Sequence, residues 1–313
     1  MSRVMVTGAA GFIGSNIVEE LVQRGEQVIA VDNLSTGRMS NIRPFLDKIT
    51  FVQADINDDE RVALALQGVD YVLHQGAIPS VPRSVRDPLT SHEANATGTL
   101  RLLMAARDGG VKRFVFASSS SVYGNSPTLP KHEEMAPNPL SPYAVNKMTG
   151  EAYCRVFTSL YGLPTVSLRY FNVFGPRQDP KSQYAAVIPA FIAAALAGRQ
   201  PTIYGDGLQT RDFTFVDNVI NANLAACATD RGDGQAINIA CGQRISLLDL
   251  MAQINAILGT NIEPLFAPER PGDVKHSMAG IEKAERLLDF RPGVDFAEGL
   301  ARTIAYMRAH PEE

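Results

Sequence analysis

Three glycines, spaced three residues apart near the start of the chain, constrain its fold more than any other feature. They stand in the string TGAAGFIG at residues 7–14, between the apolar run 3–6 and the helical periodicity of residues 12–23. This order predicts a strand, a tight turn and a helix. Such a turn needs residues without a Cβ, which permit unusual φ angles and let a pyrophosphate approach the N–H groups at the helix start.

A second apolar run, residues 27–31, ends in Asp32, eighteen residues after Gly14. A carboxylate at this position accepts hydrogen bonds from the adenosine ribose diol and favours NAD over NADP. The spacing GxxGxxG differs from the general GxGxxG fingerprint, and taken alone it also fits an ordinary glycine turn. The strand, the helix and Asp32 together favour a dinucleotide site.

Strand and helix patterns alternate through the first half of the chain, which predicts an α/β fold with a doubly wound parallel sheet of the Rossmann type. The further strand candidates are residues 50–53, 69–74, 113–117 and 164–169, and the further helical stretches are 59–66, 90–107 and 143–161. After Tyr170 prolines and glycines interrupt this rhythm, and a smaller substrate-binding lobe is expected to begin there.

The predicted division is therefore discontinuous. An NAD-binding Rossmann domain covers residues 1–169 and is rejoined by about 213–240, where a helix and a strand (216–228 and 236–240) are expected to return to the sheet. A smaller C-terminal α/β domain, formed by residues 170–212 and 241–313, is expected to bind the substrate.

Composition excludes several classes of function. The chain has 313 residues, 45% of them apolar, and a formal net charge of −4, so it has no basic field for nucleic acid. Its three cysteines form no CxxC pair, so neither a disulfide framework nor a metal site is expected. The longest apolar stretch, residues 184–197, is shorter than the roughly 20 residues of a bilayer span. With no signal peptide recognised before the first strand, a cytoplasmic protein without a membrane partner is expected.

A second string, YAVNK at residues 143–147, places Tyr143 and Lys147 four residues apart on one helix face. A lysine cation and a positively charged oxidised nicotinamide both stabilise a phenolate, so Tyr143 could act as a base near neutral pH. The spacing alone fits equally a packed ring beside a solvated ammonium. The serine-rich string SSSSVYG at residues 118–124 follows a predicted strand, where ligands bind in such folds, although a polar turn or helix cap would look the same.

Taken in order, these strings resemble a known family over nearly the whole chain. TGAAGFIG, Asp32, Asp55-Ile56, SSSSVYG, YAVNK, RYFNVFGPRQ and RPGD are similar to the extended short-chain dehydrogenase/reductases, specifically nucleotide-sugar 4-epimerases of the UDP-galactose type. The resemblance implies an isomerase that interconverts UDP-glucose and UDP-galactose through a transient 4-keto sugar. It also implies tightly bound NAD that is regenerated in each turnover.

The resemblance assigns roles to individual residues of this chain. It implies that the catalytic set is Ser119, Tyr143 and Lys147. The implied NAD-binding residues are Gly8, Gly11, Phe12, Ile13, Gly14, Asp32, Asn33, Asp55, Ile56, Asn95, Tyr143 and Lys147. The implied UDP-sugar-binding residues are Ser119, Ser120, Tyr143, Asn172, Arg211, Arg270, Asp273 and Ser277. The arginines suit bidentate phosphate recognition, although surface ion pairs would also account for them.

Two departures from the family pattern bear on function. A basic residue expected near the cofactor ribose is replaced here by Pro79 in HQGAIPSVPRS, so its hydrogen bond must be lost or supplied elsewhere. Related dehydratases and decarboxylases carry an acid just before VYG, where this chain has Ser120 and Ser121. Water elimination needs such an acid, so a dehydratase is disfavoured.

The choice of substrate depends on weaker signals. Ser277 takes the place where these epimerases have either a bulky tyrosine or a small residue facing the C2 substituent of the sugar, and a small residue leaves room for an N-acetyl group. SVPRS at 80–84 and YAAVIP at 184–189 also resemble the subgroup acting on N-acetylated sugars. The sequence therefore predicts use of UDP-GlcNAc and UDP-GalNAc as well.

Three alternatives remain open. A UDP-glucuronate 4-epimerase would have a similar serine-rich stretch, but the resemblance favours threonine there at the position of Asn172. A non-catalytic NAD-binding regulatory protein would be expected to lose Tyr143 or Lys147. A net dehydrogenase would accumulate NADH, whereas an epimerase needs no added NAD.

The resemblance further implies a homodimer through a four-helix bundle, formed by the helical stretches 92–107 and 143–161 of each chain. Apolar residues occur on more than one face of these stretches, and the simpler interpretation is that they only cover the sheet. A role in galactose metabolism and a role in supplying surface-glycan precursors both fit the sequence.

Overall fold

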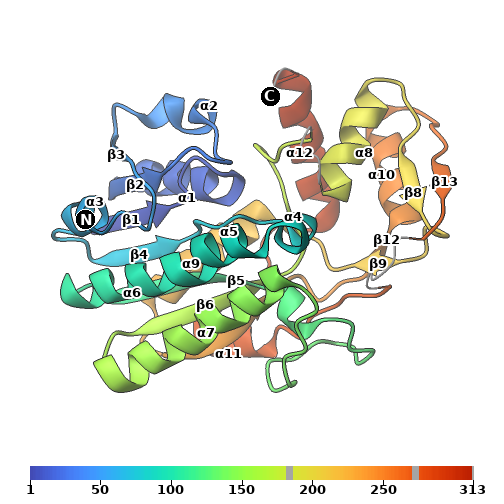
Figure 1. Cartoon of the computed structure of the whole chain (residues 1–313). Helices are drawn as coiled ribbons and strands as arrows, with labels where there is room; N and C mark the ends of the chain where they lie inside the picture. Colours follow the sequence, from blue (N-terminus) through green and yellow to red (C-terminus); the bar gives the residue numbers. More distant parts are fainter. Residues whose placement is uncertain (181–185, 270–274, 312–313) are drawn as a thin grey trace.

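A parallel sheet of seven strands forms the centre of the molecule, in the order β11-β6-β5-β4-β1-β2-β3 (Figure 1). The computed structural model describes residues 1–180, 186–269 and 275–311. The strands of the sheet are β1 (Arg3–Thr7), β2 (Gln27–Asp32), β3 (Ile49–Gln53), β4 (Tyr71–His74), β5 (Arg113–Ser119), β6 (Thr165–Tyr170) and β11 (Gln235–Ile239). The predicted doubly wound Rossmann fold is confirmed.

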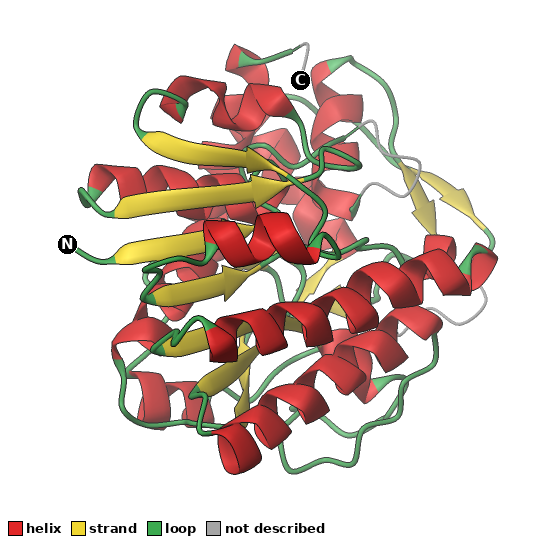
Figure 2. Ribbon diagram, turned by 60° about the vertical axis from the view of Figure 1, so that its left-hand side comes forward, coloured by secondary structure: helices red, strands yellow, loops and turns green. Residues whose placement is uncertain are grey.

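Helices cover both faces of this sheet, because successive side chains of a buried strand point to opposite sides (Figure 2). In β1, Val4 and Val6 pack into one apolar cluster with Ile17 of α1, whereas Met5 packs into another with Leu102 of α6. The covering helices are α1 (Phe12–Gln23) and α9 (Val216–Ala228) on one face, and α3 (Asp59–Ala65), α6 (Gly98–Asp108) and α7 (Pro142–Tyr161) on the other.

The predicted helix and strand near 216–240 do return to the sheet. β11 pairs in parallel with β6, with Gln235 opposite Val166 and Ile239 opposite Tyr170. The chain thus leaves the sheet after β6 and rejoins it at its edge. The exact domain boundaries given above stay a prediction.

The second lobe contains short elements, on the right of Figure 1. Its sheets have two strands each, β8 with β13 and β9 with β12, and a further pair, β7 with β10, lies next to the main sheet. The elements of this lobe are α8 (Val187–Leu196), β8 (Thr202–Tyr204), β9 (Thr210–Arg211), β12 (Ile245–Ser246), α10 (Leu247–Leu258) and β13 (Leu265–Ala267). The pair beside the main sheet is β7 (Val173–Phe174) and β10 (Thr214–Phe215). α12 (Phe296–Ala309) packs against α8 and α10, whereas α11 (Glu282–Leu288) packs against β11 and α9.

The stretch predicted as one helix over residues 90–107 is helical but changes its hydrogen bonding. It consists of α5 (Pro88–His92), the π-helical turn η2 (Glu93–Thr97) and α6. π-Helical turns often mark functional sites. The remaining short elements are α2 (Met39–Ile42), η1 (Arg43–Phe45), α4 (Val81–Arg86) and η3 (Ser120–Tyr123).

No helix within residues 1–180, 186–269 and 275–311 is long and apolar enough to cross a membrane. The same residues contain no cluster of three or more His, Cys, Asp or Glu side chains that could hold a metal ion.

Candidate active site

The glycine turn brings backbone segments closer together than any side chain would allow. Gly8 has a φ of +64°, and a Cβ on it would lie 2.8 Å from the Cα of Gly76. A Cβ on Gly14 would lie 2.1 Å from the carbonyl oxygen of Gly8. Glycine is therefore required at both positions, and the start of α1 lies open beside the turn.

Asp32, at the carboxyl end of β2, is buried beside this turn. Its Oδ2 accepts a hydrogen bond from the N–H of Ala10 at 2.9 Å, and its Oδ1 accepts one from the N–H of Leu34 at 2.7 Å. Burial raises the pKa of Asp32, while the two N–H donors act in the opposite direction. Each oxygen has lone-pair capacity left for a ribose hydroxyl, as the predicted role requires.

A cavity of about 600 Å³ extends from the turn along the carboxyl edge of the sheet. Six predicted cofactor-binding residues line it: Gly8, Gly11, Phe12, Ile13, Gly14 and Asp32. This lining fits NAD, because a cradle without Cβ atoms and a ribose-binding carboxylate stand in one cavity.

Six other predicted cofactor residues are not part of that lining: Asn33, Asp55, Ile56, Asn95, Tyr143 and Lys147. The amide of Asn33 donates to Asp55 Oδ2 at 2.7 Å, so these two bind each other. Ile56 packs against Gly98, because a Cβ on Gly98 would lie 2.5 Å from Cδ1 of Ile56. Asn95 accepts from the N–H of Ile78 at 2.8 Å and donates to its carbonyl oxygen at 3.2 Å. Asn95 thus holds the loop after β4.

Tyr143 and Lys147 lie in the first turns of α7, which Ser141 caps by accepting a hydrogen bond from the N–H of Ala144 at 3.2 Å. Lys147 Nζ donates to the carbonyl oxygen of Ala117 at 2.7 Å and lies 5.8 Å from the centroid of the Tyr143 ring. The two residues therefore share one face, as predicted.

Burial changes the acidity of both groups. It lowers the pKa of Lys147 to about 8 and raises the pKa of Tyr143 to about 12. A side-chain hydrogen bond between Ser119 and Tyr143 acts against the rise in the tyrosine pKa. The structure thus joins all three predicted catalytic residues, with a protonated phenol before any cationic cofactor is added.

The serines after β5 have distinct surroundings. Ser118 donates to Glu151 Oε1 at 2.5 Å and faces the protein interior. Ser119 Oγ accepts from the N–H of Ser121 at 3.2 Å, so it is a cap as well as a partner of Tyr143. Ser120 begins η3 and is half-buried. The expected hydroxyls at the edge of the sheet are present.

Sequence reasoning missed a buried hydroxyl that links α7, the helix of Tyr143 and Lys147, to the loop after β4. Ser91 of α5 has its Oγ 3.2 Å from Asn146 Nδ2 and 3.3 Å from Asn95 Nδ2. Asn146 belongs to YAVNK, and Asn95 holds Ile78. The two asparagines were visible in the sequence, but their common partner Ser91 carried no signal.

A second cavity, of about 610 Å³, adjoins the first, since Val173 and Ala186 line both. Of the predicted substrate residues, Asn172 and Arg211 line it. Ser277 is not part of its lining, but the N–H of Ser277 donates to the carbonyl oxygen of Thr210 at 3.0 Å, next to Arg211. Arg270 and Asp273 lie outside the described residues.

Asp212 is a further residue that the sequence did not single out. Its buried carboxylate accepts from the N–H groups of Cys241, Gly242 and Ala279 at 3.0 to 3.1 Å. Burial raises its pKa to about 6. Its own carbonyl oxygen accepts from Asn172 Nδ2 at 3.1 Å, so Asp212 joins three segments beside the second cavity.

Pro79, where the family pattern has a base, lines the first cavity. Three arginines that were not predicted as site residues line it as well: Arg38, Arg83 and Arg177. Of these, Arg83 stood in the string SVPRS and Arg177 in the string RYFNVFGPRQ, and both strings were used only as marks of a resemblance.

Comparison with known proteins gives matches over most of the chain. The model of the "NAD dependent epimerase/dehydratase family" matches residues 4–240. A UDP-glucose 4-epimerase of Mycolicibacterium smegmatis is 42% identical over 310 residues, covering 98% of each chain.

Two solved structures are similar over almost their full lengths. A UDP-N-acetylglucosamine 4-epimerase from Methanobrevibacter ruminantium M1, in complex with UDP-N-acetylmuramic acid, has a TM-score of 0.94 and 41% identity, with 98% of each chain covered. A UDP-glucose 4-epimerase from Thermus thermophilus, in complex with NAD, has a TM-score of 0.90 and 38% identity, covering 98% of this chain and 99% of that one.

Proposed function

This chain belongs to the NAD dependent epimerase/dehydratase family, and we propose that it is an isomerase that inverts C4 of UDP-hexoses. Its activity is the NAD-dependent interconversion of UDP-glucose and UDP-galactose. One observation carries this conclusion. Ser119, Tyr143 and Lys147 lie together at one edge of the main sheet, and the glycine turn at residues 8–14 follows β1 of the same sheet. The relatives described above are named as UDP-sugar 4-epimerases, and each matches this chain over nearly its whole length.

The residues present fit NAD. Gly8, Gly11 and Gly14 would hold its diphosphate at the start of α1, and Asp32 would bind the adenosine ribose. When bound, NAD accepts a hydride from C4 of the sugar and returns it to the other face of the resulting 4-keto sugar.

The proton of the sugar 4-hydroxyl is handled by the chain itself. Tyr143 removes it and later returns it, and the hydroxyl of Ser119 lies in the hydrogen-bond path. The cation of Lys147, 5.8 Å from the centroid of the Tyr143 ring, and the positive charge of oxidised NAD would together favour the phenolate against the effect of burial. Because the proton and the hydride both return, the reaction is redox-neutral.

Inversion also requires the hexose to turn over between the two hydride transfers. We propose that Asn172, Arg211, Arg270 and Asp273 hold the UDP moiety, so the binding energy lies away from the reacting carbon. Asn172 and Arg211 line the second cavity, which adjoins the cofactor cavity. The sugar is then free to rotate between them.

Removal of the Tyr143 hydroxyl tests the mechanism. We expect Tyr143→Phe to lower kcat by about 10²- to 10⁴-fold, because general acid–base catalysis contributes that much. The assay converts UDP-galactose without added NAD and follows UDP-glucose and NADH. Bound NAD per chain should match the wild type. Full activity in this variant, or net accumulation of NADH by the wild type, would contradict the mechanism.

We further propose that UDP-GlcNAc and UDP-GalNAc are substrates. The small side chain at Ser277 and the similarity to an epimerase in complex with UDP-N-acetylmuramic acid support this extension. We expect Ser277→Tyr to lower kcat/KM for UDP-GlcNAc at least tenfold and to leave UDP-glucose turnover within about threefold. Ser277→Ala, which keeps the space open, is the matched control. Unchanged turnover of UDP-GlcNAc and UDP-GalNAc by Ser277→Tyr would contradict the proposed role of Ser277.

A UDP-glucuronate 4-epimerase is the alternative substrate class. The resemblance favours threonine in that class at the position of Asn172, and this difference argues for neutral hexoses. Assaying the wild type with UDP-glucose, UDP-GlcNAc and UDP-glucuronate under the same conditions separates the three possibilities. Higher kcat/KM for UDP-glucuronate would replace the proposed substrate.

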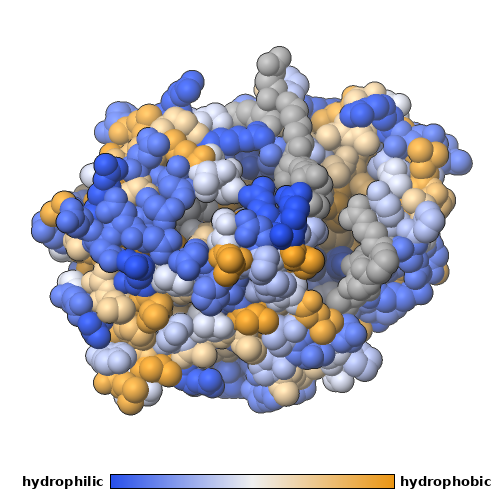
Figure 3. Space-filling view, viewed as in Figure 1, coloured by the Kyte–Doolittle hydropathy of each residue, from blue (hydrophilic) through white to orange (hydrophobic). Residues whose placement is uncertain are grey.

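A homodimer through a four-helix bundle is our proposal for the assembly. Apolar side chains lie exposed on the helices concerned, with Met104 of α6 45% exposed and Leu160 of α7 73% exposed. Figure 3 shows hydrophobic side chains over the part of this face where α6 and α7 lie. Covering them with the same helices of a second copy would remove this surface from water. Light scattering of Leu160→Lys against the wild type tests the proposal.

The cellular setting is also a proposal. Cys154, Cys227 and Cys241 are free thiols, as expected of a cytoplasmic protein. A role in galactose metabolism follows from the proposed substrates and is tested by growth on galactose after deletion of the gene.

A further inference from the structure

The arginines that line the cofactor cavity differ in their partners. Arg38 Nη2 lies 2.6 Å from Asp179 Oδ2, and Arg177 is paired with Glu19. Among the residues that the structure describes, the guanidinium of Arg83 makes neither an ion pair nor a hydrogen bond. Two of the three cations are thus neutralised by the protein, whereas no described residue neutralises the third.

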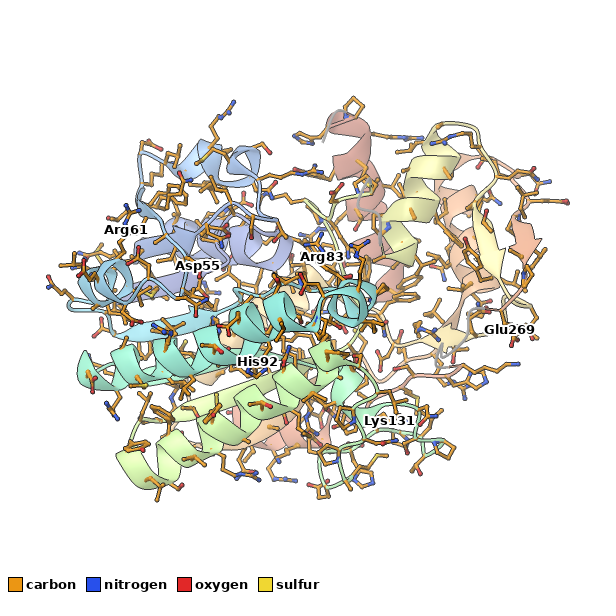
Figure 4. All side chains as sticks on the ribbon, viewed as in Figure 1. Asp55, Arg61, Arg83, His92, Lys131 and Glu269 are labelled. Carbon is orange, nitrogen blue, oxygen red and sulfur yellow. The ribbon has the colours of Figure 1, made fainter. Side chains whose placement is uncertain are left out.

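The backbone around Arg83 is held firmly beside the catalytic helix. The N–H of Arg83 donates to Oγ of Ser80, the cap of α4, at 3.2 Å. Ser84, the next residue, accepts a hydrogen bond from the N–H of Tyr143 at 3.1 Å. Figure 4 shows Arg83 on α4, at the junction between the cofactor side and the second lobe. Its half-buried side chain is therefore placed over the cavity by the same contact that anchors α7.

A half-buried cation without a counter-ion is suited to an anionic ligand, and a guanidinium binds two phosphate oxygens at once. The same cavity contains Gly8 and Gly11 at the start of α1, which also favours an anion. The family's base is absent at Pro79, which lines the cavity four residues before Arg83.

We propose that Arg83 binds a diphosphate in this cavity and supplies from α4 the positive charge that Pro79 does not supply. The proposal rests on the proposed function, which brings two diphosphates to the site, that of NAD and that of the UDP-sugar. Both offer the same chemistry to a guanidinium, and experiment distinguishes them.

The test compares Arg83→Gln with Arg86→Gln, which removes a cation from the exposed end of the same helix. One arm measures NAD released per chain after denaturation, and the other measures the Kd of UDP by titration calorimetry. We expect Arg83→Gln to lower the NAD content at least threefold or to raise the Kd of UDP at least tenfold. Arg86→Gln should leave both within twofold of the wild type.

Each outcome has one meaning. Loss of NAD alone assigns the diphosphate to the cofactor, and weaker UDP binding alone assigns it to the substrate. Arg83→Lys keeps the positive charge but loses the two parallel N–H donors of the guanidinium, so it should show an intermediate defect. It replaces Arg83→Gln in the test if Arg83→Gln does not fold. NAD content and Kd both within twofold of Arg86→Gln would overturn the proposal. A wild type that binds NAD and UDP without epimerising UDP-galactose would instead overturn the proposed function.

Discussion

The two halves of the site are held together by different kinds of contact. On the cofactor side, the carbonyl oxygen of Gly8 lies where a Cβ of Gly14 would have to be, so close backbone packing fixes the turn. On the substrate side, the strands have only two or three residues, and the buried carboxylate of Asp212, between β9 and β10, binds the loop segments at Cys241–Gly242 and at Ala279. The cofactor side therefore depends on glycines without a Cβ, and the substrate side depends on hydrogen bonds to the carboxylate of Asp212.

This difference teaches where each half tolerates change. Packing in the turn is intolerant of even one added methyl group, because dense backbone contacts cannot relax locally. The substrate side can lose a hydrogen bond and still keep its sheet pairings, so its position should loosen rather than be lost. The predictions below test that contrast.

The largest effect is expected on the cofactor side. Gly14→Ala places a Cβ 2.1 Å from the Gly8 carbonyl oxygen and should cost about 3 kcal/mol of unfolding free energy, together with bound NAD. The matched control is Gly11→Ala, where the same contact would be 3.1 Å and the loss of stability correspondingly smaller. Urea unfolding and NAD content check this. Equal free energies of unfolding for Gly14→Ala and Gly11→Ala would contradict the packing argument.

A smaller effect is expected on the substrate side. Asp212→Ala leaves the N–H groups of Cys241, Gly242 and Ala279 without their acceptor and should cost about 2 kcal/mol. The KM for UDP-glucose should rise while bound NAD per chain stays constant. Asp212→Asn, which retains one acceptor oxygen, should lose less. If NAD were lost as readily as UDP-sugar affinity, the two halves would not be separately held.

The smallest effect is a difference in pH response. His74 is buried between the hydroxyls of Thr7 and Thr99, at 2.7 and 3.0 Å, and burial lowers its pKa to about 3. Below pH 6.5 the unfolded chain binds a proton that the native chain does not, so stability falls as the pH falls. Asp212, with a pKa raised to about 6, has the opposite effect, because its native form takes up a proton first.

Substitution should expose these opposite signs. Between pH 6.5 and 5.5, His74→Gln should lose about 1 kcal/mol less stability than the wild type. Asp212→Asn should lose more than the wild type over the same interval. Urea unfolding at both pH values measures the two differences. Parallel pH dependence in all three proteins would show that neither group titrates as its burial requires.

Much of the cofactor side could be predicted from the sequence, because its elements are local. The strand, the turn and the helix around Gly8 to Gly14 follow from nearby residues, and Tyr143 and Lys147 share a face through helical spacing alone. The return of β11 to the sheet was also predicted, from an apolar run after a helix.

The substrate side was less accessible, because its contacts join residues far apart in the chain. Asp212 binds Ala279 across 67 positions, and Ser91 joins Asn95 to Asn146, 55 positions after Ser91. Neither Asp212 nor Ser91 stands in a pattern that differs from an ordinary polar residue. Arg83 was visible only as part of a short string, and the sequence does not reveal that none of the described residues forms an ion pair with it.

The sequence by itself thus determined the local parts of the proposed site: a glycine turn, an acid at the end of the second strand, and a tyrosine and lysine on one helix face. These depend on spacings of three to four residues, which local backbone geometry converts directly into positions. Only the tertiary structure decided which charges are neutralised and which are left for a ligand. Ion pairing and burial are set by neighbours from distant segments, such as Asp179 for Arg38 and none of the described residues for Arg83.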